Sequence, residues 1–377
     1  MLRYKEKNIL RIAKRINNGR RPYLLVNPLQ AKHVPVAPSK ALQMMASLGE
    51  VVAKKYNSAR LVIGFAETAT AIGAVVAKSI SDDCLYIHTT RENVNTTMEY
   101  VYFTEEHSHA TEQKLVADEL NNFFSSTSTV ILVDDEFSTG KTLINMVNQL
   151  KATYPALSGK RIVAASIINR LSEENLKRWE NEGIESVCLL KLPNIDYTAE
   201  VAPILAETAE CCSAAQRRPQ SAASVLVCNL PDPRSGVVIS DYYEMCIAKA
   251  ELIKNSCELK GKRVLVLGTE ECMLPALLIG SKIEEMRLAK SVRCHATTRS
   301  PIGICSAAGY PIKSGYRLHS FYDVNRETFI YNLHKYDVAI IVSDTDKPFN
   351  SGLYDLSIAL NANGCKSILC MVGENDV

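Results

Sequence analysis

The sequence predicts an α/β fold with two parallel sheets, each flanked by helices. Its 377 residues exceed the usual size of one hydrophobic core, so two domains are expected. Unbroken apolar runs rich in β-branched residues, such as LVIGF at 61–65, are typical of strands buried on both faces. These runs alternate with segments that have the apolar spacing of helices, which is the order expected of a parallel sheet.

Four strands are expected in the first half of the chain. They cover residues 61–65, 84–90, 129–135 and 161–168. Helical spacing follows the first of them in ETATAIGAVVAKSI and the third in KTLINMVNQLKATY. The first half is therefore expected to be an open parallel sheet with helices on its faces.

A second domain is expected after a change in composition. Residues 209–224, AECCSAAQRRPQSAAS, are small and polar with a proline, which is typical of an interdomain linker. Further apolar strands follow at 262–268, 291–298 and 337–344. We therefore expect domains at 1–208 and 225–377, and the second is again α/β.

The composition argues against nucleic acid and membrane partners and favours a reducing compartment. The formal charge of +2 gives no basic field that would attract nucleic acid or a membrane surface. The twelve cysteines are scattered and lack CxxC spacing, so free thiols in a reducing compartment are expected. No apolar run is long enough to span a bilayer, and the start of the chain lacks a signal-peptide core. We expect a cytoplasmic protein; an organelle presequence is the alternative for the basic start.

The segment TVILVDDEFSTGKTLINMV carries the most chemical information. A buried strand ends in Asp134 and Asp135, a loop of small residues follows, and an apolar helix begins. Backbone N–H groups of such a loop and the positive end of the helix dipole bind phosphate. The two carboxylates can accept hydrogen bonds from neighbouring ribose hydroxyls. The predicted ligand is a sugar phosphate; the alternative is a helix cap beside solvated aspartates.

A P-loop is excluded at this segment. The pattern GxxxxGK[ST] needs a glycine at position 135, where this chain has an aspartate.

VILVDDEFSTGKT resembles the signature of type I phosphoribosyltransferases, which bind phosphoribosyl pyrophosphate (PRPP) on an α/β sheet. The chain resembles orotate phosphoribosyltransferases in particular. The resemblance implies transfer of ribose 5-phosphate to a nucleobase-like acceptor, with Mg²⁺ and release of diphosphate. It also implies that Asp134 and Asp135 hold the ribose hydroxyls. The 5-phosphate would be held by the residues that follow them, Phe137, Ser138, Thr139, Gly140, Lys141 and Thr142.

The family's diphosphate loop follows an earlier strand, and LVIGFAETATAIG matches that place. Its turn consists of Gly64, Phe65, Ala66, Glu67 and Thr68. A turn of small residues that leads into a helix N-terminus suits the leaving diphosphate. Glu67, with Asp134 and Asp135, is a candidate ligand of Mg²⁺, which prefers carboxylate oxygen and water. A glutamate in the first helical turn is the alternative for Glu67.

The family's closing loop corresponds to residues 91–112. Arg91 resembles the arginine that opens this loop and meets diphosphate oxygens. Glu106, His107 and His109 form a polar cluster that could shuttle a proton or bind metal, and a hydrated surface is the alternative.

Candidate acceptor contacts lie in two segments. Arg170 follows the next strand at the place where orotate phosphoribosyltransferases carry an arginine for the orotate carboxylate, and a guanidinium suits a carboxylated acceptor. A strand-end surface residue is the alternative. The segment 21–38 precedes the core, where the family places a hood over the base; Gln30, Lys32 and His33 are its candidate contacts.

The second half contains HATTRSP at 295–301, and the whole chain resembles a bacterial group that joins a phosphoribosyltransferase-like domain to a domain named for its TRSP residues. That group occurs in gene clusters associated with tellurite resistance and stress, and a nucleoside-like product has been proposed for its pathway. Homodimers are typical of similar enzymes. A non-catalytic PRPP-binding regulator is the alternative function.

Similar spacing of strand ends in the two halves suggests that the second domain is a diverged copy of the first. The general rhythm of α/β folds is the alternative. A copy would surround a second ligand site with Glu270, Glu271, Arg299, Ser300 and Asp344.

Overall fold

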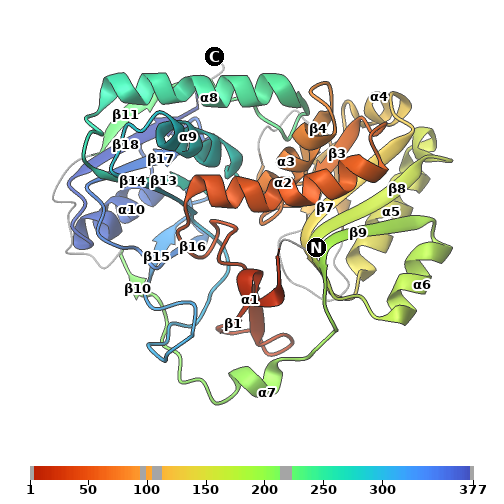
Figure 1. The fold of residues 1–377 in the computed structure, drawn as a ribbon, viewed down its shortest axis with the longest axis horizontal. Helices are drawn as coiled ribbons and strands as arrows, with labels where there is room; N and C mark the ends of the chain where they lie inside the picture. The colour runs from red at the N-terminus through yellow and green to blue at the C-terminus, as the bar shows by residue number, and fades with distance from the viewer. Residues whose placement is uncertain (1–3, 94–98, 104–112, 213–222, 374–377) are drawn as a thin grey trace. The chain divides into compact units, whose positions relative to one another are not determined.

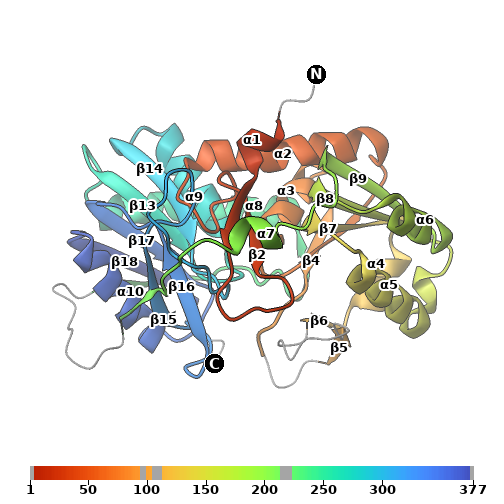
Figure 2. The ribbon, with the colours of Figure 1, turned by 90° about the horizontal axis from the view of Figure 1, so that it is seen from below.

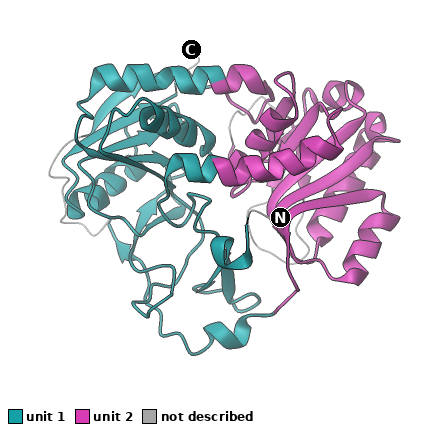
Figure 3. Ribbon diagram, viewed as in Figure 1, with its two compact units in different colours: residues 1–42, 196–230, 244–377 teal, residues 43–195, 231–243 magenta. Residues whose placement is uncertain are grey.

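The computed structural model describes residues 4–93, 99–103, 113–212 and 223–373. The chain divides into two compact units (Figure 3). Unit 1 comprises residues 1–42, 196–230 and 244–377, and unit 2 comprises residues 43–195 and 231–243. Each unit holds a parallel sheet with helices, which confirms the predicted α/β class and the second sheet. None of the described helices is long and apolar enough to cross a membrane.

Unit 2 is built on a six-stranded sheet in the order β12-β4-β3-β7-β8-β9 (Figure 1). Its strands are β3 (Leu61–Gly64), β4 (Leu85–His88), β7 (Thr129–Phe137), β8 (Arg161–Asn169), β9 (Ile184–Lys191) and β12 (Val237–Val238). Neighbours are parallel except for β12 and β4, which are antiparallel. The four strands expected in the first half are thus present, and they form the middle of one sheet.

Helices cover this sheet because their apolar faces complete its core. They are α3 (Thr70–Ile80), α4 (Leu120–Ser125), α5 (Lys141–Thr153) and α6 (Glu173–Asn181), with a 3₁₀ turn η1 (Pro155–Leu157). Phe124 of α4, Leu143 of α5 and Trp179 of α6 belong to one buried cluster with Ile63 and Leu132 of the sheet. These three helices therefore lie on the same sheet face (Figure 2). A short antiparallel hairpin, β5 (Tyr100–Phe103) and β6 (Gln113–Val116), also belongs to this unit.

Unit 1 is built on a five-stranded parallel sheet in the order β11-β18-β17-β13-β14. Its strands are β11 (Ser224–Val227), β13 (Arg263–Gly268), β14 (Ser291–Ala296), β17 (Val338–Val342) and β18 (Ser367–Val372). Helices α9 (Leu274–Glu285) and α10 (Ser351–Ala362) pack with it through almost wholly buried faces. The three strands expected in the second half are β13, β14 and β17, and all three are present.

Unit 1 also holds a three-stranded sheet, an N-terminal hairpin and two short helices. These elements are β10 (Glu210–Cys211), β15 (Gly315–His319) and β16 (Glu327–Tyr331), then β1 (Arg11–Lys14) with β2 (Tyr23–Val26), and α1 (Glu6–Ile9) with α7 (Thr198–Val201). Two 18-residue helices, α2 (Pro38–Lys55) and α8 (Ile239–Ser256), contain residues of both units.

The compact units differ from the domain boundaries expected at 1–208 and 225–377. Residues 1–42 belong to unit 1 because they bond to its later segments: Ile16 N donates to Pro301 O at 2.9 Å, and Lys14 Nζ donates to Ile204 O at 2.8 Å. Residues 231–243 belong to unit 2 because β12 pairs with β4. Of the expected linker 209–224, residues 213–222 lie outside the described residues. The twelve cysteines are all free thiols.

Candidate functional site

The turn between β7 and α5 forms the centre of the candidate site. Gly140 caps α5 with a left-handed backbone (φ 72°, ψ 3°). A Cβ atom at this position would lie 2.4 Å from the indole nitrogen of Trp179, whose N–H donates to Gly140 O at 3.2 Å. Glycine is therefore required here by both backbone conformation and space. The turn presents the N-terminus of a 13-residue helix, as the sequence predicts for a phosphate site.

The strand before this turn extends further than expected. β7 runs to Phe137, because Glu136 and Phe137 still pair with Ile168 and Asn169 of β8. Side chains alternate along a strand, so Asp134 and Glu136 share one direction and Asp135 has the other.

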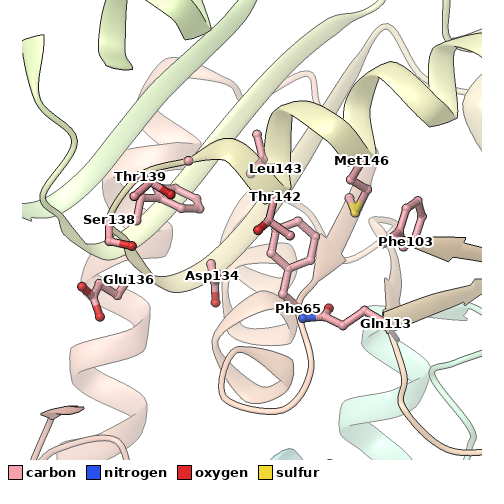
Figure 4. Close-up of a pocket in the computed structure, with 12 residues that line it drawn as sticks. Phe65, Phe103, Gln113, Asp134, Glu136, Ser138, Thr139, Thr142, Leu143 and Met146 are labelled. Atoms are coloured by element: carbon pink, nitrogen blue, oxygen red, sulfur yellow. The ribbon is translucent and has the colours of Figure 1, made fainter. Parts of the chain in front are cut away.

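Asp134 and Glu136 line a pocket of about 150 Å³ (Figure 4). Around them lie Phe65, Phe103, Gln113, Phe137, Ser138, Thr139, Gly140, Thr142, Leu143 and Met146. In the close-up, the Asp134 carboxylate lies between Glu136 on one side and Phe65 with Gln113 on the other. Glu136 was not among the site residues expected from the sequence. Its spacing of two residues from Asp134 on a strand would have placed its side chain on the same face as Asp134. The pocket combines hydroxyls, carboxylates and an apolar wall.

Asp135 connects the acidic pair to the predicted diphosphate loop. Thr68 Oγ1 donates to Asp135 Oδ1 at 3.0 Å. The loop is also tied to the next strand, since Ala66 N donates to Thr89 Oγ1 at 2.8 Å. Two motifs that are 67 positions apart in the sequence thus meet at the carboxyl ends of β3 and β7. The carboxyl ends of parallel strands are the usual ligand position in open α/β sheets.

Close packing holds the predicted diphosphate loop in place. The Cβ that Gly73 of α3 lacks would lie 2.9 Å from the Cα of Gly64, so the helix approaches the strand end through two glycines. The Tyr86 hydroxyl donates to Thr70 O in the same helix. Buried contacts therefore hold the two ends of the loop, at Gly64 and Thr70, close together.

The pKa of Asp134 is raised well above its ordinary range. Burial of the carboxyl group is the largest cause, and the neighbouring Asp135 charge is the next. Asp135 N donates to Asp134 Oδ1 at 2.8 Å, which favours the charged form but does not offset burial. A site that disfavours its own negative charge gains from a cation or from hydroxyl donors.

The fit of a magnesium ion rests on these carboxylates. Among residues that the structure describes, no three His, Cys, Asp or Glu side chains gather as a preformed metal cluster. Mg²⁺ is usually held by one or two carboxylates together with water and substrate phosphates. Asp134 and Asp135, with Glu67 on the adjoining loop, suit that mode of binding.

Arg170 is engaged by the protein itself. Its side chain is 1% exposed, and Nη1 pairs with Glu136 Oε1 at 2.9 Å. The same guanidinium contacts Ile195 O and Asn194 Oδ1, just after β9. Arg170 contacts the pocket through Glu136, which lines the wall. Its observed contacts therefore position the Glu136 carboxylate. Its predicted contact with an acceptor carboxylate stays a prediction.

The candidates of the closing loop are only partly described. Arg91 lies three residues after the end of β4, next to Thr90, whose backbone pairs with Lys114. Glu106, His107 and His109 lie outside the described residues.

The candidates from segment 21–38 lie in unit 1. Gln30, Lys32 and His33 are buried, and Lys32 Nζ donates to Glu270 O at 2.7 Å. They are thus placed with the second-domain candidates and are not among the residues that line the pocket in unit 2.

The second-domain candidates form a charged cluster at the carboxyl ends of β13 and β17. Glu270 Oε2 accepts from Arg299 Nε at 2.8 Å and from Arg326 Nη2 at 3.0 Å. Glu271 Oε1 accepts from Arg299 Nη2 at 3.3 Å. Asp344 accepts from the Tyr322 hydroxyl, and Ser300 N donates to Thr298 Oγ1 at 3.3 Å. The structure therefore brings Glu270, Glu271 and Arg299 into direct contact.

Comparison with known families identifies two matching models. One, described as "Phosphoribosyl transferase", matches residues 9–191. The other, described as "TRSP domain C terminus to PRTase_2", matches residues 239–356. No curated protein matches the sequence.

Solved structures with similar folds include adenine and orotate phosphoribosyltransferases. The Trypanosoma brucei adenine enzyme is 15% identical, with 50% of this chain and 78% of that chain covered, at a TM-score of 0.36. The Saccharomyces cerevisiae adenine enzyme is 14% identical, with coverages of 49% and 96% and a TM-score of 0.35. Orotate phosphoribosyltransferase from Aeropyrum pernix is 18% identical, with coverages of 50% and 89% and a TM-score of 0.32.

Proposed function

We propose that this chain, which matches a phosphoribosyltransferase family over residues 9–191 and a TRSP domain over residues 239–356, transfers ribose 5-phosphate from PRPP to a nucleobase-like acceptor and releases diphosphate. One observation carries the proposal: the acidic pair at the end of β7 joins a helix N-terminus on one side and the loop after β3 on the other. A phosphate, a vicinal diol and a diphosphate in that order make up PRPP.

Each part of PRPP has a matching group in the site. Backbone N–H groups of residues 138–142 and the positive end of α5 suit the 5-phosphate. Asp134, which lines the pocket, accepts hydrogen bonds from the ribose hydroxyls. Asp135, oriented by Thr68, extends the carboxylate pair toward the loop expected to hold the diphosphate.

Charge stabilisation and positioning supply the catalysis. Departure of diphosphate from C1 leaves an oxocarbenium-like centre, which the acceptor nitrogen attacks. Asp134 and Asp135, with Glu67 on the adjoining loop, would hold Mg²⁺, which would offset the negative charge of the leaving diphosphate. In this proposal Asp134 and Asp135 hold the ribose, and Arg91, three residues after β4, meets the leaving diphosphate. No covalent nucleophile is needed.

We propose a planar, nucleobase-like heterocycle as the acceptor. Gln113 and Glu136 in the pocket offer hydrogen-bonding groups, and Phe65 and Phe103 offer ring faces for a planar heterocycle. The resemblance to orotate enzymes and the pathway proposed for similar gene clusters favour a nucleoside-like product. A homodimer is expected from the same resemblance, and light scattering tests it.

Incubation of the full chain with PRPP, Mg²⁺ and a panel of bases, including carboxylated pyrimidines, tests the proposal. We expect diphosphate to be released with at least one base. PRPP binding without turnover on any base would favour a regulator that senses PRPP. Absence of PRPP binding in the presence of Mg²⁺ would overturn the assignment of the site.

A further inference from the structure

The two halves of the chain repeat one order of elements. Apart from α4 and the 3₁₀ turn η1, the first half runs β2, α2, β3, α3, β4, hairpin β5–β6, β7, α5 and β8. Apart from the two-residue strand β12, the second half runs β11, α8, β13, α9, β14, hairpin β15–β16, β17, α10 and β18. The long helices α2 and α8 have the same length of 18 residues. The first strands differ, because β2 pairs antiparallel with β1 whereas β11 joins the parallel sheet beside β18. From the long helix onward, the shared order of elements supports the expectation of a diverged copy.

Strand register and hydrogen bonds define equivalent positions. Gly64 at the end of β3 and Gly268 at the end of β13 each lie between two parallel neighbours. Thr89 N donates to Gly64 O at 2.9 Å, and Thr297 N donates to Gly268 O at 3.1 Å. Thr89 and Thr297 are therefore equivalent, and so are the arginines two positions later, Arg91 and Arg299.

The loops after the two glycines are equivalent as well. Thr89 Oγ1 accepts from Ala66 N at 2.8 Å, and Thr297 Oγ1 accepts from Glu270 N at 3.0 Å. Ala66 in the predicted diphosphate loop thus corresponds to Glu270 in the second repeat.

Each repeat contributes a short segment to the other repeat's sheet. Val237 in β12 pairs antiparallel with Tyr86 in β4, within unit 2. Val36 forms an antiparallel bridge with Cys294 in β14, within unit 1. Tyr86 and Cys294 occupy the same strand position relative to Gly64 and Gly268. The exchange therefore follows one pattern in both directions.

The segment contributed to unit 2 carries a buried arginine. Arg234, 3% exposed, pairs through Nη1 with Asp232 Oδ1 at 3.0 Å. Its Nε donates to Thr90 Oγ1 at 3.2 Å, and the preceding residue, Pro233, accepts from His88 N at 3.3 Å. Thr90 stands between Thr89, which holds the predicted diphosphate loop, and Arg91. The cation thus lies at the carboxyl end of β4, beside the place expected for diphosphate.

The second repeat provides an internal example of an anion at this place. The Glu270 carboxylate, on the loop equivalent to 65–68, is bound by Arg299, the equivalent of Arg91. Lys32, from the segment exchanged into unit 1, donates through Nζ to Glu270 O at 2.7 Å. In unit 1 a strand-end arginine and a cation of the exchanged segment therefore both contact the residue that carries the anion. In the first repeat that residue is Ala66, which brings no charge of its own.

We propose that Arg234, supplied by the second repeat, binds the diphosphate group of PRPP in the site of the first repeat. The inference rests on the proposed function, and it adds a residue that lies outside the matched phosphoribosyltransferase segment 9–191. Asp232 orients the guanidinium, and β12 holds the segment in the sheet. The second repeat is then part of the active site and more than an appended domain.

Titration of the full chain with three probes, in the presence of Mg²⁺, tests the proposal. Arg234→Gln is expected to weaken binding of inorganic diphosphate and of PRPP by about 10- to 100-fold, the usual effect of losing a charged hydrogen bond. Binding of ribose 5-phosphate is expected to stay at the wild-type level, because that probe lacks the diphosphate. Arg263→Gln, which removes an arginine paired at 2.7 Å with Asp337 in the second repeat, is the matched control and should change none of the three affinities.

Equal weakening of all three probes by Arg234→Gln would indicate a structural role and overturn the proposal, as would wild-type affinity for diphosphate. If this variant does not fold, Arg234→Lys keeps the charge and should bind diphosphate several-fold more weakly than wild type, with ribose 5-phosphate unchanged. Unchanged diphosphate binding in Arg234→Lys would then overturn the proposal. Failure of the wild-type chain to bind PRPP would instead overturn the proposed function itself.

Discussion

Replacing Asp134 with asparagine should move ligand affinity and stability in opposite directions. Asp134 is partly buried beside Asp135, and both factors raise the pKa of its carboxyl group well above the ordinary range. The folded state therefore holds this proton more tightly than the unfolded state, so the group lowers stability as the pH rises from about 4, the ordinary aspartate value. An asparagine has no charge to bury. The stability of the variant should therefore fall less than that of wild type as the pH rises.

Ligand binding should respond in the opposite sense. A charged hydrogen bond contributes about 1.5–3 kcal/mol, so its loss should raise the dissociation constant for PRPP by about 10- to 150-fold. Scanning calorimetry from pH 4 to pH 8 measures the first effect, and titration calorimetry with PRPP and Mg²⁺ measures the second. The variant should be at least as stable as wild type at pH 7 and converge toward it at pH 4.

Two results would refute this reasoning. An unchanged PRPP affinity would remove Asp134 from the ribose site. A variant that is less stable at pH 7 than at pH 4, relative to wild type, would mean that the charged carboxylate stabilises the fold, contrary to its burial beside Asp135.

Two further predictions concern the framework of the pocket. Gly140→Ala should destabilise the fold by more than the roughly 1–2 kcal/mol of a left-handed backbone, because its Cβ would lie 2.4 Å from Trp179. Gly159→Ala, with a φ of +75° and no atom within 4 Å, isolates the backbone contribution, so equal losses in denaturant titrations would contradict the steric argument. Arg170→Met should cost about 3–5 kcal/mol, because Glu136 would keep a largely buried charge without its partner. Adding Glu136→Gln should recover part of that loss, and strictly additive losses in a double-mutant cycle would show that the pair is not coupled.

The local features of the site could be predicted from the sequence. The run TVILVDD reads as a buried strand, STG as a turn and KTLINMV as an apolar helix, and each depends only on residues near one another in the chain. Gly140 is a further example, since a left-handed residue at a helix start favours glycine whatever packs around it. The turn before α5 and the acidic pair that precedes it follow from these local preferences.

Other features depended on which strands pair. The extension of β7 to Phe137 is set by its pairing with β8, and it turns Glu136 toward the pocket beside Asp134. The contact of Arg170 with Glu136 likewise joins two parallel strands, where an arginine alone is compatible with either a ligand or a carboxylate partner.

Amino-acid patterning by itself determined the α/β class, the strand and helix order, and the turn at Gly140, because short-range sterics and apolar periodicity act within a few residues. Only the tertiary structure decided where segments 31–36 and 231–243 pair, and therefore that Lys32 belongs to unit 1 and Arg234 to unit 2. Such pairing joins residues separated by well over a hundred positions. This pairing leaves no periodic pattern in either segment, because it is stabilised by hydrogen bonds and burial between residues that are far apart in the sequence.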